Sequence, residues 1–352
     1  MDEGLVLALD LGASRLRAAL VGPGGTVLAR SEAPSATERG AAAVLDAAED
    51  LLRSVRDPGG RGSEREGDDD ARRAAGFPRR SPLAIGISAI GPLDPIAGVI
   101  IDPPNAHPSF RDVPIAAELS RRLGLPAFLD RDTNVALLGE HAFGAARDVQ
   151  DVVYLTVSTG IGGAILVGGQ LLHGPDGTAG ELGHLLVDLD GPPCGCGARG
   201  HLEGIASGSG IVRAAGEAVR AGTGGLLRAA ADREGIDRLS AVDVAAAEEA
   251  GDAGAAAIME RARAAFAAAM VTIVDVFNPT LVVVGGSLAR GQGDRLLGPT
   301  RDAVCSAAFR TPGRRVRIVP AALGDDVALI GCLPLVGMRL PDMTGNAAAS
   351  GA

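Results

Sequence analysis

The stretch GELGHLLVDLDGPPCGCGARGHLEG, residues 180–204, holds a dense group of side chains that can bind a metal ion. It contains Cys194 and Cys196 together with His184 and His201, and two thiolates with two imidazoles form a valid tetrahedral zinc set. Two cysteines separated by one residue do not pair easily, so a local disulfide is not expected. The alternative is a loop with free thiols, because a C-x-C spacing is less specific than paired C-x-x-C motifs. We expect a structural zinc site.

Two carboxylates accompany these four residues. Glu181 precedes His184 by three positions, so one helical turn places both side chains on the same face. Glu203 follows His201 by two positions. If one ring nitrogen of His184 binds zinc, the other can donate a hydrogen bond to a hydroxyl of a polyhydroxylated substrate. The alternative is a set of ion pairs on a solvated face.

Two turns rich in glycine and hydroxyl side chains are candidates for phosphate binding. The first lies in LVLALDLGASRLRAALV, residues 5–21, and the second in VVYLTVSTGIGGAILVGG, residues 152–169. Backbone N–H groups in a turn without large side chains can hold phosphate oxygens. Two such hairpins indicate two similar half-domains with a nucleotide between them, and hence phosphoryl transfer. The candidate nucleotide contacts are Asp10, Gly12, Ser14, Thr159, Gly160, Gly162, Gly163 and, after a third apolar strand, Gly285 and Gly286.

Two aspartates follow predicted strands, and each has two readings. Asp10 is either a residue that acts on Mg²⁺, directly or through water, or an ordinary turn carboxylate. Asp132 is either a helix N-cap or a general base that accepts the proton of an attacking hydroxyl. Its position alone favours the N-cap.

Composition excludes several classes of protein. The sequence has no lysine, and all 33 basic side chains are arginine. P-loop NTPases, protein kinases and pyridoxal enzymes all need a lysine, so these classes are excluded. The net charge of −10, without a dense basic run, makes nucleic-acid binding unexpected. No signal peptide, membrane span or disulfide framework is apparent, so we expect a cytoplasmic protein that does not bind membranes.

Strands and helices mix along the chain, which predicts an α/β fold. Strands are expected at 5–10, 15–21, 25–31, 83–88, 97–101, 126–129, 281–286 and 315–319 and in a hairpin over 152–168. Helices are expected at 38–54, 114–123, 132–143, 208–221, 225–234, 240–250, 253–277 and 325–337. Residues 57–82 are predicted to be a mobile insertion or, alternatively, an interaction arm. Residues 341–352 are predicted to be a flexible tail, and Cys305 and Cys332 to be core residues.

These motifs, in this order, resemble the ROK family of bacterial sugar kinases, glucokinases and sugar-responsive repressors. The most specific match is E-x-x-H, then C-x-C-G-x-x-G, then L-E, from Glu181 to Glu203. The resemblance implies two ribonuclease-H-like domains of the actin-type ATPase class with an active-site cleft between them. The expected domains are 1–134 plus 326–340, which is the smaller, and 135–325, which carries the zinc loop.

The resemblance also implies roles for single residues. Asp132, in Arg131-Asp132-Thr133-Asn134, matches the family's catalytic aspartate, which favours the general base over the N-cap. The implied sugar contacts are Asn105, Asp132, Glu181, His184 and Glu203, and the implied zinc ligands are His184, Cys194 and Cys196, with His201 in place of a third cysteine. DLGAS and VSTGIGG match the phosphate motifs, and NPTLVVVGGSLA, residues 278–289, matches the adenosine motif.

The implied activity is ATP-dependent phosphorylation of a hexose at its 6-hydroxyl, as in a glucokinase, with ATP, Mg²⁺ and structural Zn²⁺. Alternatives are a kinase of N-acetylhexosamines (of the ManNAc or GlcNAc type) and, from another class, a non-catalytic sugar sensor or regulator. Polyphosphate is an alternative donor. Arg131 replaces a sugar-contacting asparagine of the family, and Gly12-Ala13-Ser14-Arg15 replaces its Gly-Gly-Thr-Lys. Family repressors carry a helix-turn-helix ahead of the first phosphate motif, and we expect none here. The expected partners are a sugar and a nucleotide, in a homodimer or tetramer.

Overall fold

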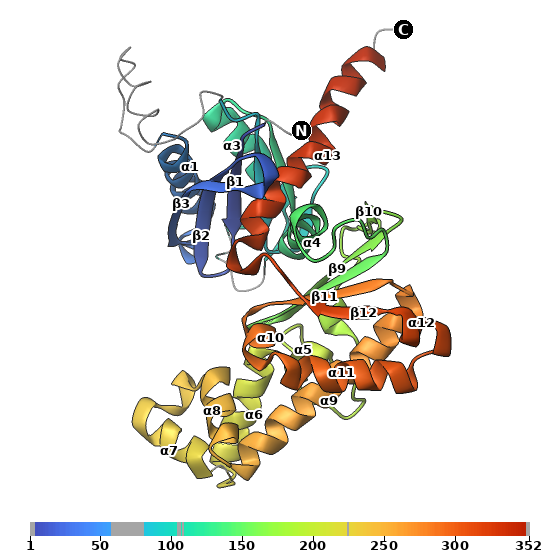
Figure 1. Ribbon diagram of the computed structural model, residues 1–352. Helices are drawn as coiled ribbons and strands as arrows, with labels where there is room; N and C mark the ends of the chain where they lie inside the picture. The colour runs from blue at the N-terminus through green and yellow to red at the C-terminus, as the bar shows by residue number, and fades with distance from the viewer. Residues whose placement is uncertain (1–3, 58–80, 104–106, 108, 224, 350–352) are drawn as a thin grey trace. The chain divides into compact units, whose positions relative to one another are not determined.

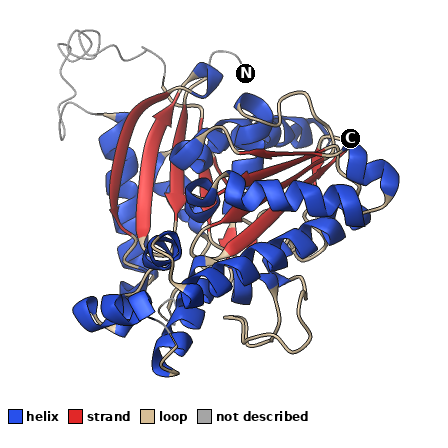
Figure 2. Cartoon of the chain, turned by 60° about the horizontal axis from the view of Figure 1, so that its bottom comes forward, coloured by secondary structure: helices blue, strands red, loops and turns tan. Residues whose placement is uncertain are grey.

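The computed structural model of the protein describes residues 4–57, 81–103, 107, 109–223 and 225–349 (Figure 1). The chain divides into two compact units. Unit 1 comprises residues 1–147, 173–178 and 325–352, and unit 2 comprises residues 148–172 and 179–324. Each unit combines a five-stranded sheet with helices, which confirms the α/β prediction (Figure 2). In the described part of the chain, no helix is long and apolar enough to cross a membrane.

The two sheets have the same topology. In unit 1 the order is β3-β2-β1-β4-β7, with β1 (Val6–Leu11), β2 (Arg15–Val21), β3 (Val27–Pro34), β4 (Ala84–Ala89) and β7 (Ala127–Arg131). In unit 2 the order is β10-β9-β8-β11-β12, with β8 (Val152–Val157), β9 (Ile161–Val167), β10 (Gln170–Leu171), β11 (Leu281–Gly285) and β12 (Arg317–Pro320). In each sheet the first three strands form an antiparallel meander, and the last two run parallel to the first. A separate ribbon pairs β5 (Leu93–Asp94) with β6 (Val99–Ile100).

Four helices belong to unit 1 and eight to unit 2 in the described residues. Those of unit 1 are α1 (Ala41–Arg56), α3 (Ile115–Leu123), α4 (Asp132–Phe143) and α13 (Val327–Ala349). Those of unit 2 are α5 (Leu202–Ala206), α6 (Gly208–Arg220), α7 (Gly225–Glu234), α8 (Ala241–Glu249), α9 (Ala253–Phe277), α10 (Ser287–Gln292), α11 (Asp294–Ala307) and α12 (Arg310–Arg315). Short 3-10 helices are η1 (Pro23–Gly25), η2 (Thr37–Arg39), η3 (Leu182–His184), η4 (Ile236–Arg238) and η5 (Gly324–Asp326).

Strand β1 is buried along its whole length. Its alternate residues Leu7 and Leu9 share a core with Val44 and Leu52 of α1. Because successive strand side chains point to opposite faces, Asp10 lies on the other face of the sheet, which α13 covers. A carboxylate on the covered face of a central strand needs polar partners there.

Helix α4, which begins at Asp132, is fixed to α13 by two glycines. A Cβ at Gly139 would lie 2.9 Å from the carbonyl oxygen of Val327, and one at Gly331 would overlap the carbonyl of Val135. Only glycine permits so close an approach of two helices. This packing holds the first turn of α4 at the end of β7.

Three differences from the sequence predictions have structural reasons. The expected boundary at residue 134 falls inside α4, which packs on α13 and belongs to unit 1. The expected tail over 341–352 is helical backbone as far as Ala349, because α13 continues through it. Cys332 is buried as predicted, but Cys305 is exposed because it lies on the outer face of α11. The prediction for 57–82 concerns residues that lie almost entirely outside the described ones.

Candidate functional site

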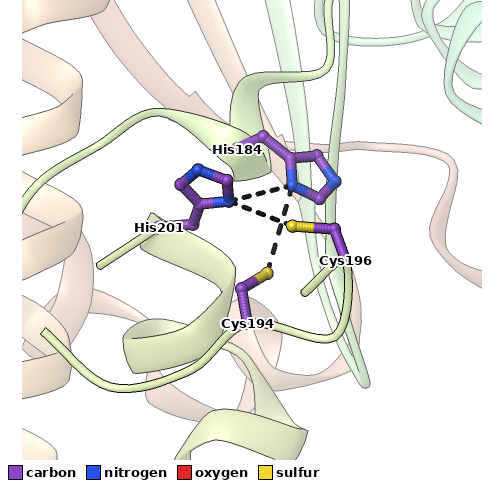
Figure 3. Close-up of side chains that lie close together, drawn as sticks. All are labelled: His184, Cys194, Cys196 and His201. Carbon is purple, nitrogen blue, oxygen red and sulfur yellow. Dashed lines mark hydrogen bonds between the residues drawn. The ribbon is translucent and has the colours of Figure 1, made fainter. Parts of the chain in front are cut away.

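Four side chains of unit 2 that could hold a metal ion gather around one point (Figure 3). Nδ1 of His184 lies 3.2 Å from Nδ1 of His201, which in turn lies 3.3 Å from Sγ of Cys196. Sγ of Cys194 lies 4.0 Å from Nδ1 of His184, and all four ligand atoms lie within 4.8 Å of one another. The structure thus brings together the four residues that the sequence predicts as zinc ligands.

These separations fit a tetrahedral ion. Zn–N distances of about 2.0–2.1 Å and Zn–S distances of about 2.3 Å place ligand atoms about 3.3–3.8 Å apart. Burial raises the pKa of the Cys194 thiol, and the nearby Cys196 thiol and Glu203 carboxylate raise it further. A divalent cation would oppose this shift, because it stabilises thiolates. The donor set therefore fits Zn²⁺ in both geometry and chemistry.

Local backbone contacts form the loop that holds the two thiols. The amide of Cys194 donates to the carbonyl of Ala198, and the amide of Gly197 donates to the carbonyl of Cys194. His201 pairs with Leu186 in an isolated bridge and directly precedes α5. The cysteine loop (residues 193–199), η3 and the start of α5 are thereby joined by hydrogen bonds, and the four side chains from these segments meet.

The ring of His184 has two distinct sides. Its Nδ1 faces Cys194 and His201, whereas its Nε2 lies 3.9 Å from Oε2 of Glu181. Glu181 immediately precedes η3, on which His184 lies, so a single 3-10 turn places both side chains. A ring held at Nδ1 can still use Nε2 to bind a hydroxyl group.

Glu203 connects the cysteine loop to the second phosphate-type turn. Its Oε2 accepts a 2.8 Å hydrogen bond from the amide of Ile161, and its Oε1 lies 3.8 Å from Sγ of Cys194. A Cβ at Gly160 would lie 2.6 Å from Oε2, so a larger residue here would displace the carboxylate of Glu203. The amide of Ile161 is therefore occupied by Glu203.

The same turn rests on the start of α6. The amide of Gly208 donates to the carbonyl of Ser158, and the amide and hydroxyl of Ser209 donate to the carbonyl of Thr159. A helix N-terminus carries a partial positive charge, which favours anions nearby. The turn is thus held on its carbonyl side by α6 and at Ile161 by Glu203.

Glycines elsewhere in the predicted nucleotide motifs pack against the protein itself. A Cβ at Gly163 would meet Leu182 and the carbonyl of Gly180, and one at Gly285 would meet the Tyr154 hydroxyl. Gly286 has a φ of +94° and lies directly against the backbone of Val157. Packing within the protein therefore accounts for these three glycines, and no bound ligand is needed to explain them.

The first turn differs from the second because it holds an ion pair. Oδ2 of Asp10 accepts hydrogen bonds of 2.9 and 2.6 Å from Nε and Nη2 of Arg17, and Oδ1 accepts one of 2.9 Å from Ser88. The amide of Gly12 donates to the carbonyl of Arg15, and the exposed Ser14 accepts a bond from the amide of Ser35 through its carbonyl. Direct Mg²⁺ ligation by Asp10 would compete with Arg17.

Sequence analysis missed both partners of Asp10. Arg17 pairs with Asp10 across the β1–β2 hairpin, and Ser88 is its neighbour on parallel strand β4. The hairpin register offered a signal for Arg17, because a turn at residues 12–14 places residues 10 and 17 opposite each other. The position of Ser88 depends on a pairing distant in sequence and had no such signal.

Asp132 is the first residue of α4, and Arg131 is the N-cap residue. Arg131 makes no side-chain capping bond, while Oδ1 of Asp132 accepts a 2.7 Å bond from the amide of Thr133. The N-cap reading of Asp132 is thus wrong by one position, because β7 extends through Arg131. A carboxylate in the first helical turn still interacts favourably with the helix dipole. Asn105 lies outside the described residues.

Known proteins resemble this chain over most of its length. The sequence profile of the ROK family matches residues 75–338. A glucokinase of Halalkalibacterium halodurans is 30% identical over 94% of this chain and 94% of its own length. A xylose repressor of Bacillus subtilis is 26% identical over 74% of this chain and 62% of its own length.

Solved structures show the same fold. A ROK hexokinase of Thermus thermophilus has a TM-score of 0.74 and 30% identity, covering 96% of this chain and 99% of that one. A ROK glucokinase of Streptomyces griseus, determined with glucose and AMPPNP, has a TM-score of 0.72 and 27% identity, covering 94% and 99%. The two-unit α/β architecture is that of the actin-type ATPases, as the resemblance implied. The chain belongs to the ROK family.

Proposed function

We propose that this chain is an ATP-dependent sugar kinase that phosphorylates the 6-hydroxyl of a hexose, with glucose as the first candidate. Its likeness to glucokinases along nearly their whole length supports the enzyme class. The observation that carries the proposal is the two-sided ring of His184. Its Nδ1 is directed to the cysteine loop, and its Nε2 lies beside Glu181, as a residue that binds a polyhydroxylated molecule requires.

Asp132 is the proposed general base. It accepts the proton of the sugar hydroxyl while that oxygen forms a bond to the γ-phosphorus, and the bond between this phosphorus and the bridging oxygen of ADP breaks. Catalysis of this kind depends mainly on positioning and charge stabilisation. Asn105, Glu181, His184 and Glu203 are the proposed sugar contacts.

The nucleotide enters with Mg²⁺ as its substrate complex. We assign its phosphates to the turns around Gly12 and Ser14 and around Thr159, Gly160, Gly162 and Gly163, and its adenosine to the segment of Gly285 and Gly286. Asp10 acts on Mg²⁺ through water rather than directly, because Arg17 occupies its Oδ2. The acidic charge of Asp10 is largely balanced by that guanidinium.

Zinc is proposed as a structural ion held by His184, Cys194, Cys196 and His201. When bound, it cross-links the loop and activates no water, because a tetrahedral ion with four protein ligands has no open position. Glu203 follows the proposed ligand His201 at the start of α5, so the ion would stabilise the position of a proposed sugar contact and of the second turn.

A panel of sugars tests the substrate. Purified protein is incubated with ATP and glucose, mannose, N-acetylmannosamine or N-acetylglucosamine, and ADP release is followed by a coupled assay. We expect glucose to give the highest kcat/KM. Preference for an acetylated sugar would replace the glucose assignment, and Arg131, buried beside Asp132, is the first residue to examine in that case. A parallel arm with polyphosphate identifies the donor.

A regulator is the second candidate, favoured by the likeness to a xylose repressor. A non-catalytic sensor would bind sugar in calorimetry without releasing ADP from ATP. A kinase releases ADP in proportion to sugar phosphate. The cytoplasmic location and the homodimer or tetramer remain predictions, and light scattering after gel filtration measures the latter.

A further inference from the structure

Asp130 is a buried carboxylate that the proposed chemistry does not use. It lies at the end of β7, two residues before Asp132, and is 1% exposed. Its Oδ1 accepts bonds of 2.8 Å from the amide of Arg131 and 2.7 Å from Nδ2 of Asn134. Its Oδ2 lies 2.8 Å from Nε2 of His173. Because an ionised carboxylate only accepts, Nε2 is the donor.

The donors come from two places in the chain. Arg131 and Asn134 flank Asp132 at the junction of β7 and α4, so Asp130 fixes the backbone on one side of Asp132 and a side chain on the other. His173 arrives from a distant segment. A buried carboxylate is stable only when it is paired or hydrogen-bonded, and His173 supplies the only one of these three hydrogen bonds that reaches Oδ2.

The segment that carries His173 is held on unit 1. Residues 173–178 belong to unit 1, although the residues on both sides of them belong to unit 2. Gly177, with a φ of +70°, lies close to β5, since a Cβ there would be 3.1 Å from the carbonyl oxygen of Leu93. His173 is 26% exposed in its side chain and reaches Asp130 from this segment.

We propose that His173 is a positioning residue for phosphoryl transfer: by donating to Asp130 it fixes the junction on which Asp132 lies. This inference rests on the proposed function, in which Asp132 is the base. When His173 is removed, Asp130 loses the bond that sets the plane of its carboxylate, and the bonds to Arg131 and Asn134 weaken with it. A small displacement of a catalytic group can reduce a rate about 100-fold.

Substitution of His173 tests the proposal with kinetics. His173→Ala is expected to lower kcat by about 10- to 100-fold while the KM values for glucose and ATP stay within about twofold. His173→Gln keeps an N–H donor of similar reach and is expected to recover most of kcat. His141→Gln, on α4 but outside the Asp130 contacts, is the control and keeps kcat. A kcat for His173→Ala within twofold of wild type, or no recovery in His173→Gln, would overturn the proposal.

Amide hydrogen exchange provides a readout that needs no substrate. The peptide spanning residues 128–137 is expected to exchange faster in His173→Ala than in wild type and to return to the wild-type rate in His173→Gln. Unchanged exchange overturns the inference whatever the activity. Asp132→Asn is measured beside these variants. If Asp132→Asn retains kcat, the proposed base is wrong, whereas an inactive Asp132→Asn with a fully active His173→Ala leaves the proposed function standing and removes only the role of His173.

Discussion

The first and second hairpins occupy equivalent places in two sheets of identical order, yet they are stabilised by different chemistry. The β1–β2 hairpin ends at a buried carboxylate, Asp10, held by a guanidinium and a hydroxyl of its own sheet. The β8–β9 turn has no such charge of its own; the carboxylate of Glu203, at the start of α5, accepts a hydrogen bond from the amide of Ile161. The shared topology therefore places the two turns, whereas the second turn also depends on a residue outside its own hairpin.

Removal of Glu203 is expected to impair the second turn more than any other change to this region. Glu203→Ala leaves the amide of Ile161 without its acceptor and removes a proposed sugar contact. A hydrogen bond to a charged group contributes about 1.5–3 kcal/mol, so kcat/KM for glucose is expected to fall at least about 100-fold from the two losses together.

Steady-state kinetics measures this effect. Glu217→Ala, which removes an exposed glutamate paired with Arg213 on α6, is the matched control and is expected to be near wild type. A Glu203→Ala enzyme that keeps its kcat/KM would show that the second turn holds its shape without Glu203.

Loss of one proposed zinc ligand is expected to have the next largest effect. Cys194→Ser is expected to reduce bound zinc from about one ion per chain, lower the melting temperature and reduce activity about tenfold or more, because a loosened loop also releases Glu203. Cys305→Ser, at an exposed cysteine of α11, is the control and is expected to keep its zinc. Elemental analysis measures the zinc content of both variants, and calorimetry measures their melting temperatures. An unchanged melting temperature in Cys194→Ser would show that this ligand does not contribute to the stability of the fold.

Residue types predicted the candidate ligands and the two turns, but not the contacts between residues far apart in the sequence. The four candidate zinc ligands and both glycine turns follow from residue type and short spacing, which the sequence displays directly. The contact between Glu203 and Ile161 spans 42 positions, and that between Ser88 and Asp10 spans 78, so neither has a local signal. The N-cap of α4 was misplaced because β7 continues one residue further, and element ends are set by tertiary packing.

Removal of the Arg17 guanidinium is expected to destabilise the first turn. Arg17→Met leaves Asp10 largely buried without its cation, and breaking a fully buried pair costs about 3–5 kcal/mol. Because the Arg17 side chain is 21% exposed, we expect a smaller loss of unfolding free energy, about 2 kcal/mol.

Urea unfolding measures this loss. Arg30→Met on neighbouring strand β3 breaks a more exposed pair with Asp326 and is expected to cost less than about 1 kcal/mol. Equal losses in the two variants would mean that burial does not distinguish the Asp10 pair from a surface pair.

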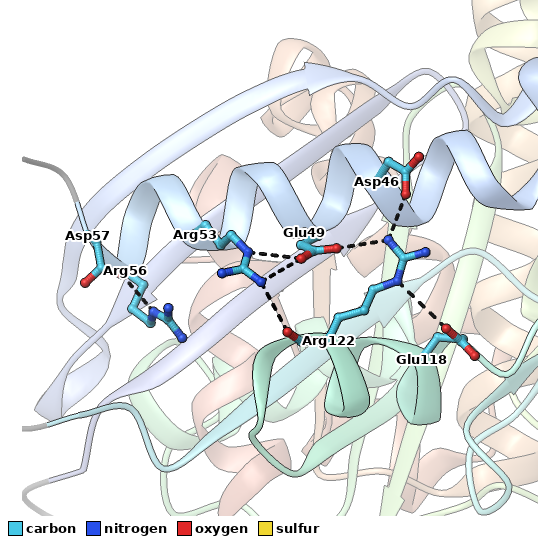
Figure 4. A network of polar contacts seen from close by, with 7 residues as sticks. All are labelled: Asp46, Glu49, Arg53, Arg56, Asp57, Glu118 and Arg122. Atoms are coloured by element: carbon cyan, nitrogen blue, oxygen red, sulfur yellow. Dashed lines mark hydrogen bonds and ion pairs between the residues drawn. The ribbon is translucent and has the colours of Figure 1, made fainter. Parts of the chain in front are cut away.

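The smallest effect is expected at the surface of unit 1, where charges join α1 to α3 (Figure 4). Glu49 accepts bonds from Arg53 at 2.7 Å and from Arg122 at 3.0 Å. The bond from Arg53 and then the bond from Arg122 hold the pKa of Glu49 below its usual value, against the opposing effect of burial. A lowered pKa in the folded state means that the contribution is complete above the unfolded-state value of about 4.3 and is lost as pH falls through the folded-state value.

Glu49→Gln is therefore expected to be less stable than wild type at pH 7 by less than about 1 kcal/mol, with the difference shrinking as the pH is lowered below about 4. Glu260→Gln, at an exposed glutamate of α9, is the control. Unfolding by urea at pH 7 and at a series of acidic pH values measures the difference between each variant and wild type. A difference that persists unchanged in acid would come from packing of the Glu49 side chain between its two arginines rather than from its charge. The surface pairs would then differ from the Asp10 pair in the kind of interaction and not only in its burial.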